Sequence, residues 1–189
     1  MTTEMYRGPV LYIVHSPLFT EVSLVPAISR NEKLLFSQRN KIIIALQKAA
    51  MGRIPVIYEA GVQGREALEG FIAESLKALN NRLNPPAKKQ LNVVWIDTSD
   101  KTTDEEIKKA FDAARIEPRK FITLGHNRDI CVKRGVSRIH KCFPNSEIHL
   151  IEGTSTVFVK LFDRERKYKG ALKKLGVQFS KKLNSKHFA

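Results

Sequence analysis

A repeated alternation of short apolar runs with longer amphipathic segments constrains the fold of this chain more than any other feature. Five apolar runs bounded by polar or turn residues are typical of buried strands, and they cover residues 10–14, 54–58, 91–96, 120–125 and 147–152. The first four are each followed by a segment of helical spacing, over residues 31–52, 65–83, 103–115 and 129–143. Repeated strand–helix units predict a three-layer α/β/α fold, with helices on both faces of a mainly parallel sheet.

The rest of the chain completes one domain. A helix ended by Gly176 is predicted over residues 168–175 and a short strand over 177–179, while residues 157–162 fit either a strand or a loop. With 189 residues the chain is long enough to bury a full core. We therefore expect a single domain over residues 1–180, followed by a basic, flexible tail over residues 181–189.

The net positive charge of the chain comes from its second half, because acidic residues balance the basic ones elsewhere. Residues 119–142 carry a net charge of +6 and residues 160–189 one of +8, which together equal the +14 of the whole chain. Such asymmetry can mark a surface for nucleic acid, an anionic membrane or an acidic protein partner. A solvated basic face that only aids solubility is the alternative. The residues that we expect to form the basic patch are Arg166, Lys167, Lys173 and Lys174.

The sequence also bears on the compartment. No apolar run is long enough to span a membrane, and the N-terminal residues lack the pattern of a signal peptide. Cys131 and Cys142 lie eleven positions apart on one predicted helix, about three turns, which is too far for a disulfide. We therefore expect a reducing, cytoplasmic location.

Ligands of parallel α/β folds bind beyond the carboxyl ends of the strands, and polar residues follow several of the predicted strands. The candidates are His15, Ser16, Glu59, Asp97, Thr98, Lys101, His126, Asn127, Cys131, Glu152 and Thr154. Cys131 is the most informative of them, because it is predicted to lie on the first turn of a helix that Asp129 can cap. A helix N-terminus and adjacent cations favour the thiolate form. The alternative is that Cys131 only packs, as most free cysteines do.

The segment around Cys131 carries a resemblance to a known family. Gly125, Asp129, Cys131 and Val132 match a Gly-x-x-x-Asp-x-Cys-Val pattern. In this pattern, and in the order of its strands and helices, the chain resembles the isochorismatase-like cysteine hydrolases, a group that includes nicotinamidases. The resemblance implies a sheet of about six strands in the order 3-2-1-4-5-6.

The resemblance also implies roles for particular residues. Cys131 would attack an amide, ester or enol ether carbon, and Lys101 would orient and polarise the substrate. A helix start supplies backbone amides for the oxyanion, so Asn127, Asp129 and Ile130 are expected to line the cleft. For Lys101 the alternative of an exposed loop lysine stays open.

The chain departs from the family after the first strand. The family has an aspartate there as the base, whereas no carboxylate occurs here between Met5 and Thr20, and Val14 takes its place. His15 is a chemically adequate substitute that would form a Cys–His dyad, unless it is an ordinary loop residue. Residues 58–65 also lack the histidines that bind metal in nicotinamidases, so no metal and no cofactor are expected.

Two functions remain open at this point. One is a divergent cysteine hydrolase of a small molecule that uses Cys131 with Lys101 and His15. The other is a catalytically inactive member of the same fold that binds nucleic acid, an anionic membrane or an acidic protein through its basic half. A homo-oligomer is compatible with either, and the absence of the family aspartate leaves open whether the chain is an enzyme at all.

Overall fold

A six-stranded sheet forms the centre of the molecule. The computed structural model describes residues 4–14, 32–60, 65–83, 89–97, 103–125, 131–152 and 162–188. The strands are β1 (Pro9–Val14), β2 (Val56–Ala60), β3 (Val93–Asp97), β4 (Lys120–Gly125), β5 (Glu147–Ile151) and β6 (Gln178–Ser180). Their order in the sheet is β3-β2-β1-β4-β5-β6, and every neighbouring pair is parallel. The predicted fold class and strand order are confirmed.

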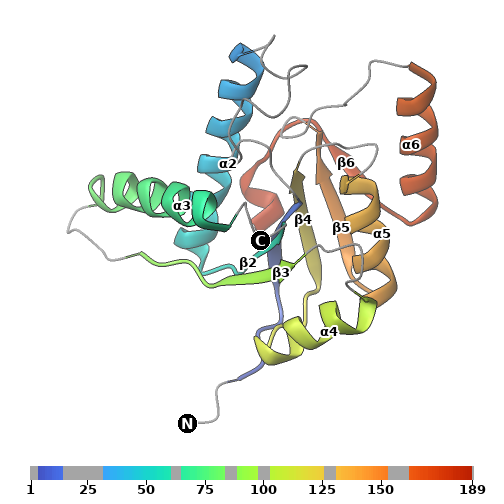
Figure 1. Cartoon of the computed structure of the whole chain (residues 1–189), viewed down its shortest axis with the longest axis horizontal. Coiled ribbons are helices and arrows are strands. Elements are labelled where there is room, and N and C mark those ends of the chain that lie inside the picture. The colour runs from blue at the N-terminus through green and yellow to red at the C-terminus, as the bar shows by residue number, and fades with distance from the viewer. Residues whose placement is uncertain are drawn as a thin grey trace.

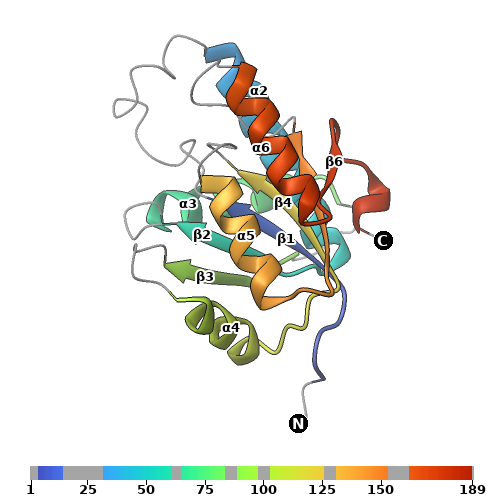
Figure 2. The same ribbon diagram turned by 90° about the vertical axis from the view of Figure 1, so that its right-hand side faces the viewer.

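Helices cover both faces of this sheet and make the three layers (Figures 1 and 2). The helices are α2 (Glu32–Gly52), α3 (Arg65–Asn80), α4 (Asp104–Ala113), α5 (Lys133–Cys142), α6 (Phe162–Lys174) and the short 3-10 helix η6 (Ser185–Phe188). One apolar core lies between the sheet and the helices α2 and α3, and a second lies between the sheet and α4, α5 and α6. Alternate residues of each strand enter the two cores, as the period of two predicts.

The starts of the last two long helices need comment. The last long helix begins at Phe162 rather than at residue 168, because its first turns are mostly charged and give no apolar period. α5 is assigned from Lys133, and Val132 before it already has helical backbone angles and makes no side-chain capping bond; the cap expected at Asp129 stays a prediction. Residues 131 and 132 form a π-helical turn that leads into α5. Asp129 itself lies outside the described residues.

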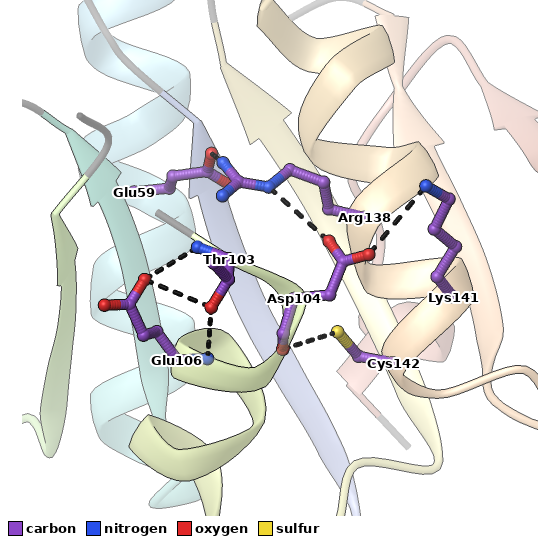
Figure 3. Close-up of polar contacts among 7 residues, drawn as sticks. All are labelled: Glu59, Thr103, Asp104, Glu106, Arg138, Lys141 and Cys142. Atoms are coloured by element: carbon purple, nitrogen blue, oxygen red, sulfur yellow. Dashed lines mark hydrogen bonds and ion pairs between the residues drawn. The ribbon is translucent and has the colours of Figure 1, made fainter. Parts of the chain in front are cut away.

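Local signals account well for the elements that position the site. The capping box at the start of α4 is present: the Thr103 hydroxyl accepts from the Glu106 backbone N–H at 3.2 Å, and Glu106 Oε2 accepts from the Thr103 N–H at 2.7 Å (Figure 3). Gly125 ends β4 with a φ of 144°, a conformation that favours glycine. A Cβ there would overlap the carbonyl oxygen of Val14 on β1. This glycine lets the two central strands end side by side.

The C-terminal residues contact the body of the domain. His187 in η6 is buried, and Leu183 and Phe188 pack against the core beneath α2. The boundary at residue 180 and the flexibility of residues 181–189 stay predictions. Among the described residues, no helix is long and apolar enough to cross a membrane.

Candidate functional site

Cys131 lies at the amino end of α5, just beyond the carboxyl end of β4. Its side chain is half-buried and packs against the core that contains Tyr12 and Val14 of β1. β1 and β4 are neighbours, with Val14 opposite Gly125. The segments that leave these two strands therefore start from adjacent points at the centre of the sheet edge. This is the position at which ligands bind in such folds.

Most of the other predicted site residues lie outside the described part of the chain. His15, Lys101, Asn127, Asp129 and Ile130 belong to this group, so their roles remain predictions. Glu59 was expected to follow the second strand, but it lies within β2, opposite Val14. It is 3% exposed. The chain thus carries a buried carboxylate in its sheet, one residue before the strand ends.

Helix α5 approaches the sheet closely at Gly135, one turn after Cys131. A Cβ at this glycine would lie 2.7 Å from Tyr12 Oη, 3.0 Å from Val14 Cγ2 and 3.1 Å from Glu59 Oε2. No side chain fits there without displacing one of these groups. Gly135 therefore brings α5 against the polar ends of Tyr12 and Glu59.

Arg138 forms the main charge contact of this region. Its Nη1 lies 3.2 Å from Glu59 Oε1, and the two side chains are 11% and 4% exposed (Figure 3). Burial raises the pKa of Glu59, and the nearby Arg138 and Arg134 charges oppose that rise without cancelling it. Glu59 is thus a buried acid with a raised pKa, paired with a cation.

Three buried oxygens on this side of the sheet have no hydrogen-bond partner in the described part of the chain. They are Tyr12 Oη, Glu59 Oε2 and Thr123 Oγ1, on the adjacent strands β1, β2 and β4. Tyr12 and Thr123 are opposite each other in the β1–β4 ladder. Buried polar groups nearly always have partners, so three exceptions on neighbouring strands are unusual.

The second cysteine belongs to a different set of contacts. Cys142 Sγ donates to the carbonyl oxygen of Asp104 at 3.3 Å, at the far end of α5 (Figure 3). The Asp104 carboxylate lies 3.9 Å from Arg138 Nε and 3.8 Å from Lys141 Nζ. Burial, followed by the Asp104 charge, raises the pKa of the Cys142 thiol. These contacts join α4 to α5, and both cysteines are free thiols.

The basic patch is only partly described. The side chains of Lys167, Lys173 and Lys174 on α6 are exposed, whereas that of Arg166 lies outside the described side chains. α6 packs beside α5 (Figure 2). On α5, Lys133, Arg134 and Lys141 are exposed. Cations of both helices thus lie on one side of the molecule.

Sequence reasoning did not identify Tyr12, Arg138 or Gly135 as parts of this site. Tyr12 looks like one more apolar strand residue, and Arg138 like one more cation of a basic helix. The single available signal was the glutamate inside an otherwise apolar run, because such a residue needs a buried partner. No cluster of three or more His, Cys, Asp or Glu side chains suited to a metal ion occurs among the described residues.

Solved structures of similar shape identify the fold. A pyrazinamidase of Pyrococcus horikoshii in complex with zinc is 12% identical with a TM-score of 0.55, covering 92% of this chain and 98% of its own. An isochorismatase hydrolase from Oleispira antarctica is 14% identical with a TM-score of 0.55, covering 95% of each chain. The chain has the isochorismatase-like hydrolase fold.

A ribonuclease, MAR1 of Caenorhabditis elegans, has the same fold at 10% identity and a TM-score of 0.51, over 94% of this chain and 78% of its own. At identities this low the likeness concerns the fold alone. A scan against protein-family models and a search of curated proteins find no match. The fold alone therefore does not determine the activity of this chain.

Proposed function

We propose that this protein is a cysteine-dependent hydrolase that acts on an amide, ester or enol ether of a small molecule through Cys131. The observation that carries the proposal is the place of Cys131: half-buried, at the amino end of α5, where β4 ends beside β1. A nucleophile needs access to a cleft, nearby backbone amides for the oxyanion and a base within reach. Lys101 and His15 follow β3 and β1 in the sequence and keep their predicted roles within this proposal.

The test uses p-nitrophenyl acetate as a probe of acyl transfer. Release of nitrophenolate should be lost in Cys131→Ala and retained in Cys142→Ser, because Cys142 is engaged with Asp104 at the other end of the helix. Mass spectrometry should find the acetyl group on Cys131. Equal release by wild type and Cys131→Ala would contradict the proposal. A cytoplasmic location suits it, since a reducing compartment keeps thiols free.

A second candidate function is binding of a polyanion, and the exposed cations of the neighbouring helices α5 and α6 favour it. RNA is the first polyanion to test, since one protein of this fold is a ribonuclease. Binding should weaken with salt, with a log–log slope of roughly −0.7 per phosphate contacted on single strands. Charge reversal at Lys167, Lys173 and Lys174 should weaken it, whereas Cys131→Ala should not. Binding that is indifferent to salt and to these reversals would exclude a role for the basic patch.

A further inference from the structure

A carboxylate lies one strand away from the position at which the resemblance places the family aspartate. Val14 occupies that position, and Glu59 is its direct neighbour on β2. Residues opposite each other in parallel strands point to the same face of a sheet. Accordingly both side chains face α5, where Gly135 makes room for them. On the face covered by α5, the chain therefore has a carboxylate level with the position of the family aspartate. It lies on β2 instead of β1.

The two oxygens of this acid differ in their contacts within the described part of the chain. Oε1 of Glu59 pairs with Arg138 at 3.2 Å, while Oε2 has no partner in the described part of the chain. Tyr12 Oη, equally buried and without a partner there, lies beside the same point of α5. Leaving such oxygens unpaired is costly, and native proteins keep them mainly where a water molecule or a reaction uses them.

Cys131 packs against the same core cluster as Tyr12 and Val14, the residues that adjoin Glu59 Oε2 at Gly135. Cys131 precedes Gly135 by four residues, so both project from the same side of the helix. The rise between them is about 6 Å, toward the carboxyl ends of the strands. Glu59 Oε2 would lie 3.1 Å from a Cβ at Gly135, about one helical turn from Cys131, so a proton that moves between the two groups needs a bridging water molecule.

We propose that Glu59 carries the proton of Cys131 during the reaction, in place of the missing aspartate; this inference rests on the proposed hydrolase function. The Cys131 proton passes through one water to Glu59 Oε2 while Sγ bonds to the acyl carbon. The tetrahedral intermediate collapses, its bond to the leaving group breaks, and the leaving atom takes the proton from Glu59. Water then attacks the thioester, gives one proton to Glu59, and that proton returns to Sγ as the acid is released.

The electrostatics of Glu59 suit a proton carrier. Burial raises the pKa of its carboxyl group above the ordinary value, so the acid holds a transferred proton better than an exposed glutamate does. Arg138 keeps the ionised form available at rest. A group that must accept and then return a proton works best when neither form is strongly preferred near neutral pH.

The first experiment measures whether the two groups are coupled, without any turnover. In a Cys142→Ser background the rate of alkylation of Cys131 by iodoacetamide is followed against pH. Glu59→Gln keeps the size of the side chain and an oxygen for Arg138. It should lower the midpoint by about one pH unit, since removing a nearby negative charge eases ionisation of the thiol. Asp104→Asn is the matched control: it neutralises a carboxylate near the same arginine, on its outer side, and should shift the midpoint less.

The second experiment compares two acetyl donors, p-nitrophenyl acetate and p-nitroacetanilide. The nitrophenolate leaves without a proton, whereas the aniline must receive one. In Glu59→Gln, acylation by the ester should persist, and acylation by the anilide should fall by about 10² or more. A purely structural effect of the substitution would slow both reactions alike, so an unchanged ratio overturns the inference. A wild-type protein that reacts with the ester but not with the anilide also overturns it.

A failure of the hydrolase proposal can be distinguished from a failure of the inference about Glu59. If neither donor acylates the wild-type protein, the hydrolase proposal is contradicted. The alkylation midpoints still decide whether Glu59 and Cys131 are coupled. Equal midpoints with and without Glu59→Gln would exclude the coupling. Should Glu59→Gln not fold, the 13C signal of the Glu59 carboxyl group is titrated in wild type and in Cys131→Ala. Coupling requires a second, alkaline inflection in wild type that Cys131→Ala lacks, and superimposable curves exclude it.

Discussion

The two faces of the sheet treat their buried polar groups differently. On the α2–α3 side, the buried Ser75 hydroxyl donates to the Phe71 carbonyl at 2.8 Å, and both ring nitrogens of His187 have partners in Asn184 and Ser180. On the α4–α5 side, oxygens of Tyr12, Glu59 and Thr123 have none in the described part of the chain. The α2–α3 face therefore has the properties of an ordinary structural core. The α4–α5 face, which also carries Cys131, contains buried oxygens without a partner among the described residues. Buried polar groups without partners lower the stability of the fold, and proteins retain them mainly at functional sites.

The largest effect should follow from removing the charge that faces Glu59. Arg138→Met leaves a buried carboxylate unpaired, which typically costs about 3–5 kcal/mol. The pKa of Glu59, already raised by burial, should rise further without the arginine. The folded variant then holds a proton that the unfolded chain releases near pH 4.3. Its stability therefore falls as pH rises from about 4.3 through the raised pKa of Glu59. Urea denaturation should accordingly show a larger loss at pH 8 than at pH 5.

The control for this substitution is Lys133→Met, an exposed cation on the same helix. It should change the free energy of unfolding by less than about 0.5 kcal/mol. A loss for Arg138→Met that does not depend on pH would mean that Glu59 is not the group left unpaired.

Substitution of one glycine in a helix on each face tests how closely that helix approaches its neighbours. Gly135→Ala on α5 would place a methyl group against Tyr12, Val14 and Glu59 and should destabilise the protein by about 1–3 kcal/mol. Gly70→Ala on α3 meets nothing within 4 Å and should stabilise by up to about 1 kcal/mol, since alanine favours a helix. Thermal unfolding of both variants checks the signs. Stabilisation by Gly135→Ala would show that α5 does not approach the sheet as closely as described.

Two hydroxyl deletions test the difference between satisfied and unsatisfied groups. Ser75→Ala removes a buried hydrogen bond and should cost about 1 kcal/mol. Thr123→Val replaces an unpartnered hydroxyl by a methyl group of the same shape and should be neutral or slightly stabilising. Denaturant midpoints of the two proteins give the comparison. An equal loss in both would indicate that Thr123 has a partner after all.

The smallest effect concerns His187 on the satisfied side. Burial, helped by the charges of His149, Lys120 and Lys48, lowers its pKa below the usual 6.5. The unfolded chain therefore takes up a proton before the folded protein does, and stability is lost as pH falls below 6.5. His187→Gln should remove this part of the pH dependence, measured as the free energy of unfolding at pH 7.5 and 5.5. Identical slopes in the two proteins would exclude His187 as the source.

The apolar runs determined the elements and, with the cysteine pattern, the fold. Strands such as residues 120–125 and the capping box of α4 depend on neighbours within a few positions, so local periodicity and side-chain chemistry predict them well. Cys131 was identified in the same way, from a pattern confined to eight residues. The start of α6 was missed because charged residues carry no apolar period.

The surroundings of Cys131 were decided by tertiary structure alone. Glu59 and Arg138 are 79 residues apart in the chain, and their contact exists because β2 pairs with β1 while α5 packs over both. A glutamate in an apolar run signals only that some partner is needed. Which partner it finds, and which oxygen stays unpaired, depends on strand register and on how closely a helix can approach, and these properties arise only when distant segments pack together.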